Sequence, residues 1–376
     1  MFSQLYTPLQ EAFGRFLASD APWDCPDFPV SPRFEEALDG LRPGAPAEAI
    51  IKAGRAVRQE RFGGAILPVV PVYGSSICAE SCLYCNYRRQ NREGVERVRL
   101  TDGQLEREMR FLAVEKGYRV LELVYASDPG ICAADIARHT RIARAVLEEV
   151  GGGVVGLNGP MLEEEDYALL AEAGMGFVAL WQETYDRDRF AALHPPPGEK
   201  PDFERRLDVF DRMRLGGIRH VGLGVLLGLA DWRRDWGMLL LHGEHLRRLY
   251  GDGPSVLGIP RLKHAPGAVD LEDRAPGDLE FRLAVALHQK AHPGCLPFVN
   301  TREDWDLCVE LARGGGCLFT FNCSTIPGGY TRSHRGAQFF SHDFDGPEFL
   351  ARAAEEGLRP ELPWQCLLPE GSPAAT

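Results

Sequence analysis

The stretch that decides the fold runs from Ile66 to Cys85 and reads Ile66-Leu-Pro-Val-Val-Pro-Val-Tyr73-Gly-Ser-Ser-Ile-Cys78-Ala-Glu-Ser-Cys82-Leu-Tyr-Cys85. Residues 66–73 form a short apolar run, which is typical of a buried β-strand. Three cysteines with the spacing CxxxCxxC follow a few residues later. A strand that leads into a loop of metal-ligating side chains predicts an active site at the carboxyl end of a parallel sheet.

Apolar runs of similar length recur along the chain, and a helical pattern follows each of them except the last. The runs are Ile66–Tyr73, Arg119–Tyr125, Val154–Asn158, Phe177–Trp181, His220–Leu227, Ser255–Pro260, Leu296–Asn300 and Cys317–Phe321. The helical patterns are Leu105–Val114, Ala133–Val150, Glu163–Ala173, Phe203–Leu215, Asp235–Leu249, Leu279–Ala291 and Arg302–Ala312. Buried strands that alternate with helices in this number predict an α/β protein with a closed (β/α)8 TIM-type barrel rather than an open doubly wound sheet.

Two further segments flank the predicted barrel, which spans residues 66–327. Residues 1–65 are expected to form an N-terminal helical layer, because apolar residues recur at helical spacing from Leu5 to Leu17 and again over Ala47–Glu60. Residues 328–376 are expected to form a loop-rich C-terminal extension with one helix near Gly346–Glu356.

Composition excludes several classes of protein. The chain has 376 residues, of which 44% are hydrophobic and 26% charged, so it can bury a sizeable core. Its 42 Lys and Arg against 54 Asp and Glu give a net charge of −12, which argues against nucleic acid as the main partner. No apolar run approaches the ~20 residues that span a bilayer, so no membrane partner is expected. Because the first residues do not resemble a signal peptide, we expect a cytoplasmic protein.

The three clustered cysteines carry most of the chemical information, because a disulfide framework is improbable in a long chain of this type. Three thiolates on one loop are able to hold three irons of a [4Fe–4S] cube, which leaves the fourth iron open to a small chelating molecule. Two alternatives remain at this point. One is a zinc site completed by a distant Cys or His, and the other is a set of three structural cysteines.

The cysteine spacing after the first strand resembles that of radical S-adenosylmethionine (SAM) enzymes, and Tyr84 before the last cysteine fits the same pattern. Within that superfamily the chain resembles the aromatic amino acid lyases, which include 2-iminoacetate synthase of thiamine thiazole synthesis, the tyrosine lyase of hydrogenase maturation, and tryptophan lyase. The matching stretches are Pro71-Val-Tyr73, Cys85-Asn-Tyr-Arg-Arg-Gln-Asn91, Gln182-Glu-Thr-Tyr185, Leu193-His-Pro195, Asp202-Phe-Glu-Arg-Arg-Leu207, Gly222-Leu-Gly-Val-Leu-Leu-Gly-Leu-Ala-Asp-Trp-Arg233, Pro260-Arg-Leu262, Thr301-Arg-Glu303, Pro327-Gly-Gly-Tyr330 and Gln338-Phe339.

The resemblance implies a [4Fe–4S] cluster on Cys78, Cys82 and Cys85 with SAM bound at the free iron. It implies that a 5′-deoxyadenosyl radical formed from SAM takes a hydrogen from the amine of a free aromatic amino acid. In the tyrosine lyases the Cα–Cβ bond then breaks to give 2-iminoacetate and p-cresol. The implied activity is therefore a carbon–carbon lyase, closest to 2-iminoacetate synthase, with a tryptophan-lyase-like or other amino acid lyase as the alternative. A zinc or iron–sulfur protein without radical chemistry is the alternative of another class.

For SAM, the resemblance points to Glu183 at the end of the fourth predicted strand, and to Arg205 or Arg206 for the SAM carboxylate. Simpler alternatives are a carboxylate stabilised at a helix start and a solvated helix face. Ser127 and Leu226 complete the set assigned to the cofactor. The glycines of Gly222-x-Gly224-x-x-x-Gly228 have the wrong spacing for a dinucleotide fingerprint. They either let the adenine of SAM approach the backbone closely or have a role in packing.

For the substrate, the resemblance places Arg302 on an arginine that holds the amino acid carboxylate, Thr320 on a hydroxyl that shares this task, and Tyr73 near the substrate amine. Arg302 is expected to start the helix after the seventh predicted strand. The simpler alternatives are a capping salt bridge for Arg302, a satisfied turn hydroxyl for Thr320 and a core aromatic for Tyr73. An electron donor, flavodoxin or ferredoxin, is implied as a partner, and Arg88, Arg89 and Arg92 offer a local basic patch for it.

Two stretches depart from the pattern of the tyrosine lyases. Thr320-Phe-Asn-Cys-Ser-Thr325 replaces the usual Ser-Ala-Gly-Ser-Arg-Thr, and Ala126-Ser-Asp-Pro129 replaces the usual Gly-Glu-His-Pro. Both lie at the expected pocket, so the departures bear on which amino acid is bound. A second cluster is not expected, because only Cys366 follows Cys323 in the tail.

Overall fold

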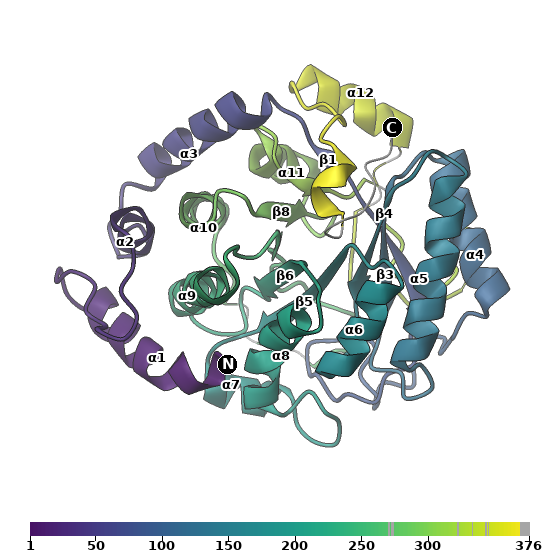
Figure 1. Ribbon diagram of the computed structural model, residues 1–376, viewed down its shortest axis with the longest axis horizontal. Helices are drawn as coiled ribbons and strands as arrows, with labels where there is room; N and C mark the ends of the chain where they lie inside the picture. Colours follow the sequence, from purple (N-terminus) through teal and green to yellow (C-terminus); the bar gives the residue numbers. More distant parts are fainter. Residues whose placement is uncertain are drawn as a thin grey trace.

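The structure of the protein is a computed structural model that describes residues 1–269, 271, 274–321, 323–332, 334–342, 344 and 346–368. Its centre is one parallel sheet with the strand order β1-β9-β8-β7-β6-β5-β4-β3-β2, surrounded by helices (Figure 1). The strands are β1 (Leu67–Pro68), β2 (Val70–Ser75), β3 (Val120–Tyr125), β4 (Val154–Asn158), β5 (Phe177–Glu183), β6 (His220–Val225), β7 (Val256–Gly258), β8 (Leu296–Val299) and β9 (Leu318–Phe319). Each of the predicted strands is present, and the predicted TIM-type barrel is confirmed.

The first predicted strand closes the barrel by pairing with two neighbours in succession. Its first part, β1, pairs with β9 through Leu67 and Leu318, whereas its second part, β2, pairs with β3. The backbone N–H of Val69, between the two parts, donates to the carbonyl of Phe319 at 3.0 Å. The two ends of the sheet are thus joined through one continuous piece of chain.

A tyrosine of the C-terminal extension bridges the upper part of this junction, where β2 has no paired strand on its other side. The hydroxyl of Tyr330 donates to the backbone carbonyl of Pro71 at 2.9 Å and accepts from the N–H of Ser324 at 3.0 Å. The carboxylate of Glu108 accepts from the backbone N–H of Tyr330 at 3.0 Å. The extension therefore supplies hydrogen bonds that a neighbouring strand supplies elsewhere in the sheet.

The helices form two groups around the sheet. Those between the strands are α4 (Asp102–Arg110), which continues as the π-helix η1 (Phe111–Glu115), α5 (Ala133–Glu148), α6 (Glu164–Glu172), α7 (Arg187–Leu193), α8 (Phe203–Leu215), α9 (Trp232–Tyr250), α10 (Asp278–Ala291) and α11 (Trp305–Ala312). The others are α1 (Ser3–Leu17), α2 (Pro32–Asp39), α3 (Ala47–Phe62), α12 (Gly346–Glu355) and the 3-10 helix η2 (Trp364–Leu367). In Figure 1 the helices α1, α2 and α3 form an arc outside α9 and α10. This arc is the predicted N-terminal layer, in which α1 contacts α9 while α2 and α3 contact α10.

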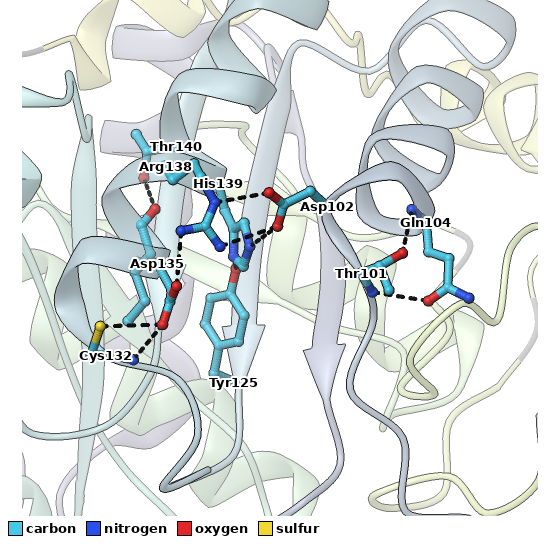
Figure 2. Close-up of polar contacts among 10 residues, drawn as sticks. Thr101, Asp102, Gln104, Tyr125, Cys132, Asp135, Arg138, His139 and Thr140 are labelled. Atoms are coloured by element: carbon cyan, nitrogen blue, oxygen red, sulfur yellow. Dashed lines mark hydrogen bonds and ion pairs between the residues drawn. The ribbon is translucent and has the colours of Figure 1, made fainter.

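Behind β3, a chain of polar contacts fixes α4 against α5 (Figure 2). The guanidinium of Arg138 pairs with Asp102 at 2.8 Å and with Asp135 at 2.9 Å. Nε2 of His139 lies 3.1 Å from Asp102, and Nδ1 of the same ring lies 2.8 Å from the hydroxyl of Tyr125. These contacts hold the end of β3 in place, where the predicted cofactor residue Ser127 follows.

Among the described residues, no helix is long and apolar enough to cross a membrane.

Candidate active site

A cavity of about 210 Å³ lies at the carboxyl ends of the strands, which is where barrel enzymes carry their active sites. Side chains from the strand ends and from the C-terminal extension line it. All the predicted site residues except Arg205 are among them: Tyr73, Cys78, Cys82, Cys85, Ser127, Glu183, Arg206, Leu226, Arg302 and Thr320. The structure therefore brings residues from widely separated parts of the chain to one site.

Arg97 fixes the shape of the cysteine loop. One terminal nitrogen, Nη1, donates to the carbonyls of Ser76 at 2.7 Å and Tyr87 at 2.9 Å. The other, Nη2, donates to the carbonyls of Arg88 at 2.8 Å and Asn91 at 2.9 Å. One planar guanidinium thus ties together backbone from both sides of the three cysteines and brings a positive charge to the loop.

The donor set of this loop fits an iron–sulfur cluster. Burial raises the pKa of Cys78 to about 11 and of Cys82 to about 12, and it also raises the pKa of Cys85. Burial disfavours isolated thiolates, and a bound metal centre would compensate their charge. Among the described residues, no three His, Cys, Asp or Glu side chains are grouped for a single metal ion. The predicted alternative of a zinc site thus gains no support, whereas a cube binds each thiolate at a different iron.

We expect that replacing Arg97 with methionine lowers iron incorporation by at least about tenfold, because outer groups that orient metal ligands typically contribute at this level. Iron per protein chain after anaerobic reconstitution is the measurement. The Arg99→Met variant is the control, because Arg99 pairs with Asp128 at 2.5 Å and makes no contact with the carbonyls of the cysteine loop that Arg97 binds. Full iron content in the Arg97 variant contradicts the assigned role.

Glu183 faces the cavity beside two cations. Its Oε1 atom accepts from Nζ of Lys200 at 2.6 Å and lies 3.8 Å from Nη2 of Arg206. Burial opposes ionisation, but the charges of Lys200 and Arg206 hold the pKa of Glu183 below its ordinary value. Among the described residues it is the non-glycine with positive φ, at 71°, a strained conformation that is often found at functional sites. Glu183 is the last residue of β5, and the next helix, α7, is capped by the side chain of Asp186, so the predicted alternative of a helix-start carboxylate does not apply.

Lys200 was missed by the sequence analysis, and a residue between the cysteines explains its position. The carboxylate of Glu80 accepts from the backbone N–H groups of Glu199 and Lys200, each at 3.2 Å. Glu80 lies between Cys78 and Cys82, so the cysteine loop itself anchors the segment that carries Lys200 into the cavity. A single lysine in a Pro- and Gly-rich loop gave no signal in the sequence.

The two arginines predicted to bind the SAM carboxylate differ in their position relative to the cavity. Arg205 lies outside the cavity, where its guanidinium pairs with Glu163 at 2.6 Å and Glu199 at 2.8 Å. Arg206 lines the cavity, and its Nε donates to the carbonyl of Trp181 at 3.0 Å. Adjacent residues on a helix point about 100° apart, so the geometry favours Arg206 over Arg205 for the predicted contact with the cofactor.

The glycines of β6 accommodate a tryptophan. A Cβ atom at Gly224 would lie 2.6 Å from the ring of Trp181, and a Cβ atom at Gly222 would lie 2.5 Å from the Cβ of Ala179. The space beside these glycines is thus filled by side chains of β5, in agreement with the packing alternative. Leu226, which follows β6, does line the cavity.

Arg302 lies in the turn before α11 and not at the start of that helix. The helix begins one turn later because the side chain of Asp304 accepts from the N–H of Leu307 and caps it. The Cζ atom of Arg302 lies 3.5 Å from the centre of the Phe339 ring. No carboxylate of the described residues pairs with this guanidinium, so the predicted alternative of a capping salt bridge is wrong. Burial lowers its pKa from the ordinary value.

Thr320 and Tyr73 face the same cavity. The side chain of Thr320 is 0% exposed, and its Oγ1 atom has no hydrogen-bond partner among the described residues. The predicted alternative of a satisfied turn hydroxyl is therefore wrong. The hydroxyl of Tyr73 donates to Oε1 of Gln338 at 2.7 Å, so a residue of the C-terminal extension sets its direction.

Glu122 is a further cavity residue that the sequence analysis missed. It lies in β3, is 4% exposed, and has an Oε1 atom without a hydrogen-bond partner among the described residues. Burial raises the pKa of its carboxyl group to about 8. The signal was available in the sequence, because Glu122 interrupts the apolar run Val120-Leu-Glu-Leu-Val-Tyr125, and buried acidic residues are rare unless paired.

We expect that replacing Glu122 with glutamine stabilises the protein in a pH-dependent manner. Between the unfolded pKa near 4.5 and the folded pKa near 8, the folded protein keeps a proton that the unfolded chain has released. Stability of the natural protein therefore falls as the pH rises through this window, and the glutamine variant lacks this loss. Urea unfolding at pH 5.5 and pH 8 should show the advantage of the variant growing by about 3 kcal/mol. A constant difference contradicts the prediction.

The comparisons with known proteins agree with this geometry. Residues 72–235 match the radical SAM superfamily. The chain is 30% identical to the 2-iminoacetate synthase of Escherichia coli over 324 residues, which is 83% of this chain and 81% of that protein. The chain belongs to the radical SAM aromatic amino acid lyase family. The hydrogenase maturase HydG superposes on this radical SAM enzyme with a TM-score of 0.80 and 28% identity, over 94% of this chain and 76% of HydG. Methylornithine synthase, with 19% identity and a TM-score of 0.69, shares the fold.

Membership defines the cofactors and the broad chemistry. Radical SAM enzymes use a [4Fe–4S] cluster and SAM, so these are the cofactors of this family member. Its lyase relatives act on free amino acids and need a reductant. A protein with a zinc site or without radical chemistry, the predicted alternative of another class, does not agree with this membership.

Proposed function

We propose that this radical SAM enzyme cleaves the Cα–Cβ bond of a free aromatic amino acid, with L-tyrosine split into 2-iminoacetate and p-cresol. The observation that carries the proposal is the guanidinium of Arg302, which faces the cavity without a carboxylate partner among the described residues. A half-buried guanidinium without a carboxylate partner fits the carboxylate of an amino acid, which it binds with two parallel hydrogen bonds. The similarity to 2-iminoacetate synthase supports the same reaction.

In this proposal Cys78, Cys82 and Cys85 hold the cluster, and Glu183 with Arg206 binds the amino and carboxylate groups of SAM. When bound there, the cluster and SAM would supply the radical chemistry by which a hydrogen atom is removed from the substrate. Lys200 keeps Glu183 ionised, so that this carboxylate is ready to accept from an ammonium group. Ser127 and Leu226 form part of the wall on this side.

The other side of the cavity positions the amino acid. Arg302 binds its carboxylate, and the free hydroxyl of Thr320 donates a further hydrogen bond to the same group. Tyr73, held by Gln338, lies beside the substrate amine in this arrangement. The amine then faces the radical source, because Tyr73 lies in β2, the strand that leads to the cysteine loop.

The cluster loop also offers a place for the electron donor, for which we propose a flavodoxin or a ferredoxin. Arg89 and Arg92 are exposed on the segment that follows Cys85, and Arg88 is half-buried. Positive side chains next to a redox centre favour an acidic partner in spite of the net charge of −12.

An anaerobic turnover assay with tyrosine and tryptophan in competition tests the proposal. Reconstituted enzyme with SAM and a chemical reductant should form p-cresol and glyoxylate, the hydrolysis product of 2-iminoacetate. An indole acid as the product would instead identify a tryptophan-lyase-like enzyme. Cleavage of SAM without consumption of either amino acid would refute an aromatic amino acid lyase.

A further inference from the structure

We propose that Glu122 selects the substrate by accepting a hydrogen bond from a donor at the tip of the amino acid side chain. The donor is the phenol O–H of tyrosine or, by the same chemistry, the ammonium of a basic side chain. This inference rests on the proposed function for the placement of the amino acid, since Arg302 is taken to hold the carboxylate end. It adds the feature that distinguishes one side chain from another.

The strand register places Glu122 at the deep end of the cavity. Several strands contribute two lining residues each, for example Tyr73 after Pro71, Glu183 after Trp181, and Asn300 after Phe298. All strands of the sheet run in the same direction, so the earlier residue of each pair lies farther from the mouth. Glu122 is the earlier residue on β3, and it is paired in register with Pro71.

The surroundings of Glu122 are otherwise apolar. The deep lining residues of other strands are Pro71, Trp181, Gly258 and Phe298. These residues belong to β2, β5, β7 and β8; such walls accept an aromatic ring or an aliphatic stem, and none of these four side chains offers a hydrogen-bond acceptor to a donor at its tip. The carboxyl group of Glu122 is thus a polar group at the deep end of the cavity, where the other lining side chains are apolar. A few polar groups in a mostly apolar pocket are what give it specificity.

Nothing in the described part of the protein satisfies this carboxyl group. Its Oε1 atom has no hydrogen-bond partner, and no Lys, Arg or His of the described residues pairs with it. Buried polar side chains in folded proteins are nearly always paired, so an unpaired one that lines a cavity indicates a bound water or ligand there. Thr320, a second buried side chain without a partner, lines the same cavity. Two unsatisfied groups in one cavity point to a bound molecule that satisfies both.

An amino acid whose side chain has no donor should bind poorly, because it displaces water from Glu122 and forms no hydrogen bond in place of that water. Sites that are built to bind a hydroxyl group reject the analogue that lacks it far more strongly than sites that only measure size. Phenylalanine differs from tyrosine only by this hydroxyl group, and norleucine differs from lysine only by the ammonium group. Each pair therefore isolates the contribution of the donor.

Calorimetric binding to the anaerobically reconstituted enzyme with SAM, left unreduced so that no turnover occurs, tests the inference. The natural protein should bind L-tyrosine at least about 50-fold more tightly than phenylalanine, or L-lysine more tightly than norleucine by the same factor. In Glu122→Leu this ratio should fall to about threefold or less, whereas Glu122→Gln should keep part of it through the amide oxygen. Because each ratio is taken within one variant, a general loss of folding cancels.

The outcomes separate this inference from the proposed function. Equal binding of both members in each pair by the natural protein overturns the inference, and so does a preference that survives in Glu122→Leu. The lyase proposal still stands in those cases if tyrosine is converted to p-cresol. Selective binding of lysine over norleucine without binding of tyrosine supports the role of Glu122 and instead refutes an aromatic substrate.

Discussion

Replacing Cys82 with alanine is expected to abolish the formation of 5′-deoxyadenosine from SAM, with a loss of at least about 100-fold. Cys82 lines the cavity. In the sequence it lies between the other two cysteines, Cys78 and Cys85. Each of the three proposed ligands holds a different iron, so the loss of one leaves an iron without a protein ligand. The measurements are iron content, visible absorbance and 5′-deoxyadenosine after anaerobic reduction.

The matched control for this variant is Cys132→Ser. Cys132 is exposed, lies outside the cavity and precedes the first turn of α5, where serine is a favoured residue. The control should keep its iron and its ability to cleave SAM. If Cys82→Ala also keeps both, the cluster is bound elsewhere and the assignment of the cysteine loop fails.

Replacing Arg302 with methionine is expected to reduce kcat/KM for the amino acid by about 100- to 1,000-fold, because one partner of a buried charge pair is lost. Binding of SAM should change little, since Glu183 and Arg206 provide the proposed contacts with it. The unfolding midpoint without substrate should stay the same or rise, because a half-buried charge without a carboxylate partner among the described residues is removed. Steady-state kinetics, SAM binding and thermal unfolding measure the three quantities.

Arg205→Met is the control for this second variant. It removes an arginine that pairs with Glu163 and Glu199 outside the cavity, and such pairs contribute little to stability. The control should leave kcat/KM for the amino acid unchanged. A loss of SAM binding in Arg302→Met, with amino acid binding intact, would mean that this guanidinium serves the cofactor and not the substrate.

The barrel was predictable because its strands are buried on both faces. Apolar runs such as Val154–Asn158 and Phe177–Trp181 therefore stood out from the amphipathic helices between them. The division of the first strand was not predictable, since pairing partners depend on how the sheet curves to close. The bridge from Tyr330 to Pro71 was equally hidden, because it joins residues that are far apart in the sequence.

The site was predictable where chemistry is concentrated in a short motif, as with the three cysteines. Residues whose roles depend on direction were harder to assign. Arg205 and Arg206 are neighbours in sequence, and only the helix geometry shows which of them faces the cavity. Lys200 reaches the site only because Glu80 holds its loop. Glu122 was open to detection, because a carboxylate inside an apolar strand already indicates an unusual environment.

The division of the first strand also determines when the enzyme becomes complete during synthesis. Leu67 leaves the ribosome long before Leu318, with which it pairs. We expect the nascent chain to wait as an open sheet, since contacts between distant residues form late. Insertion of the metal centre would then follow the emergence of residue 318, and a chain halted before that residue would carry the proposed ligands without the closed barrel around them.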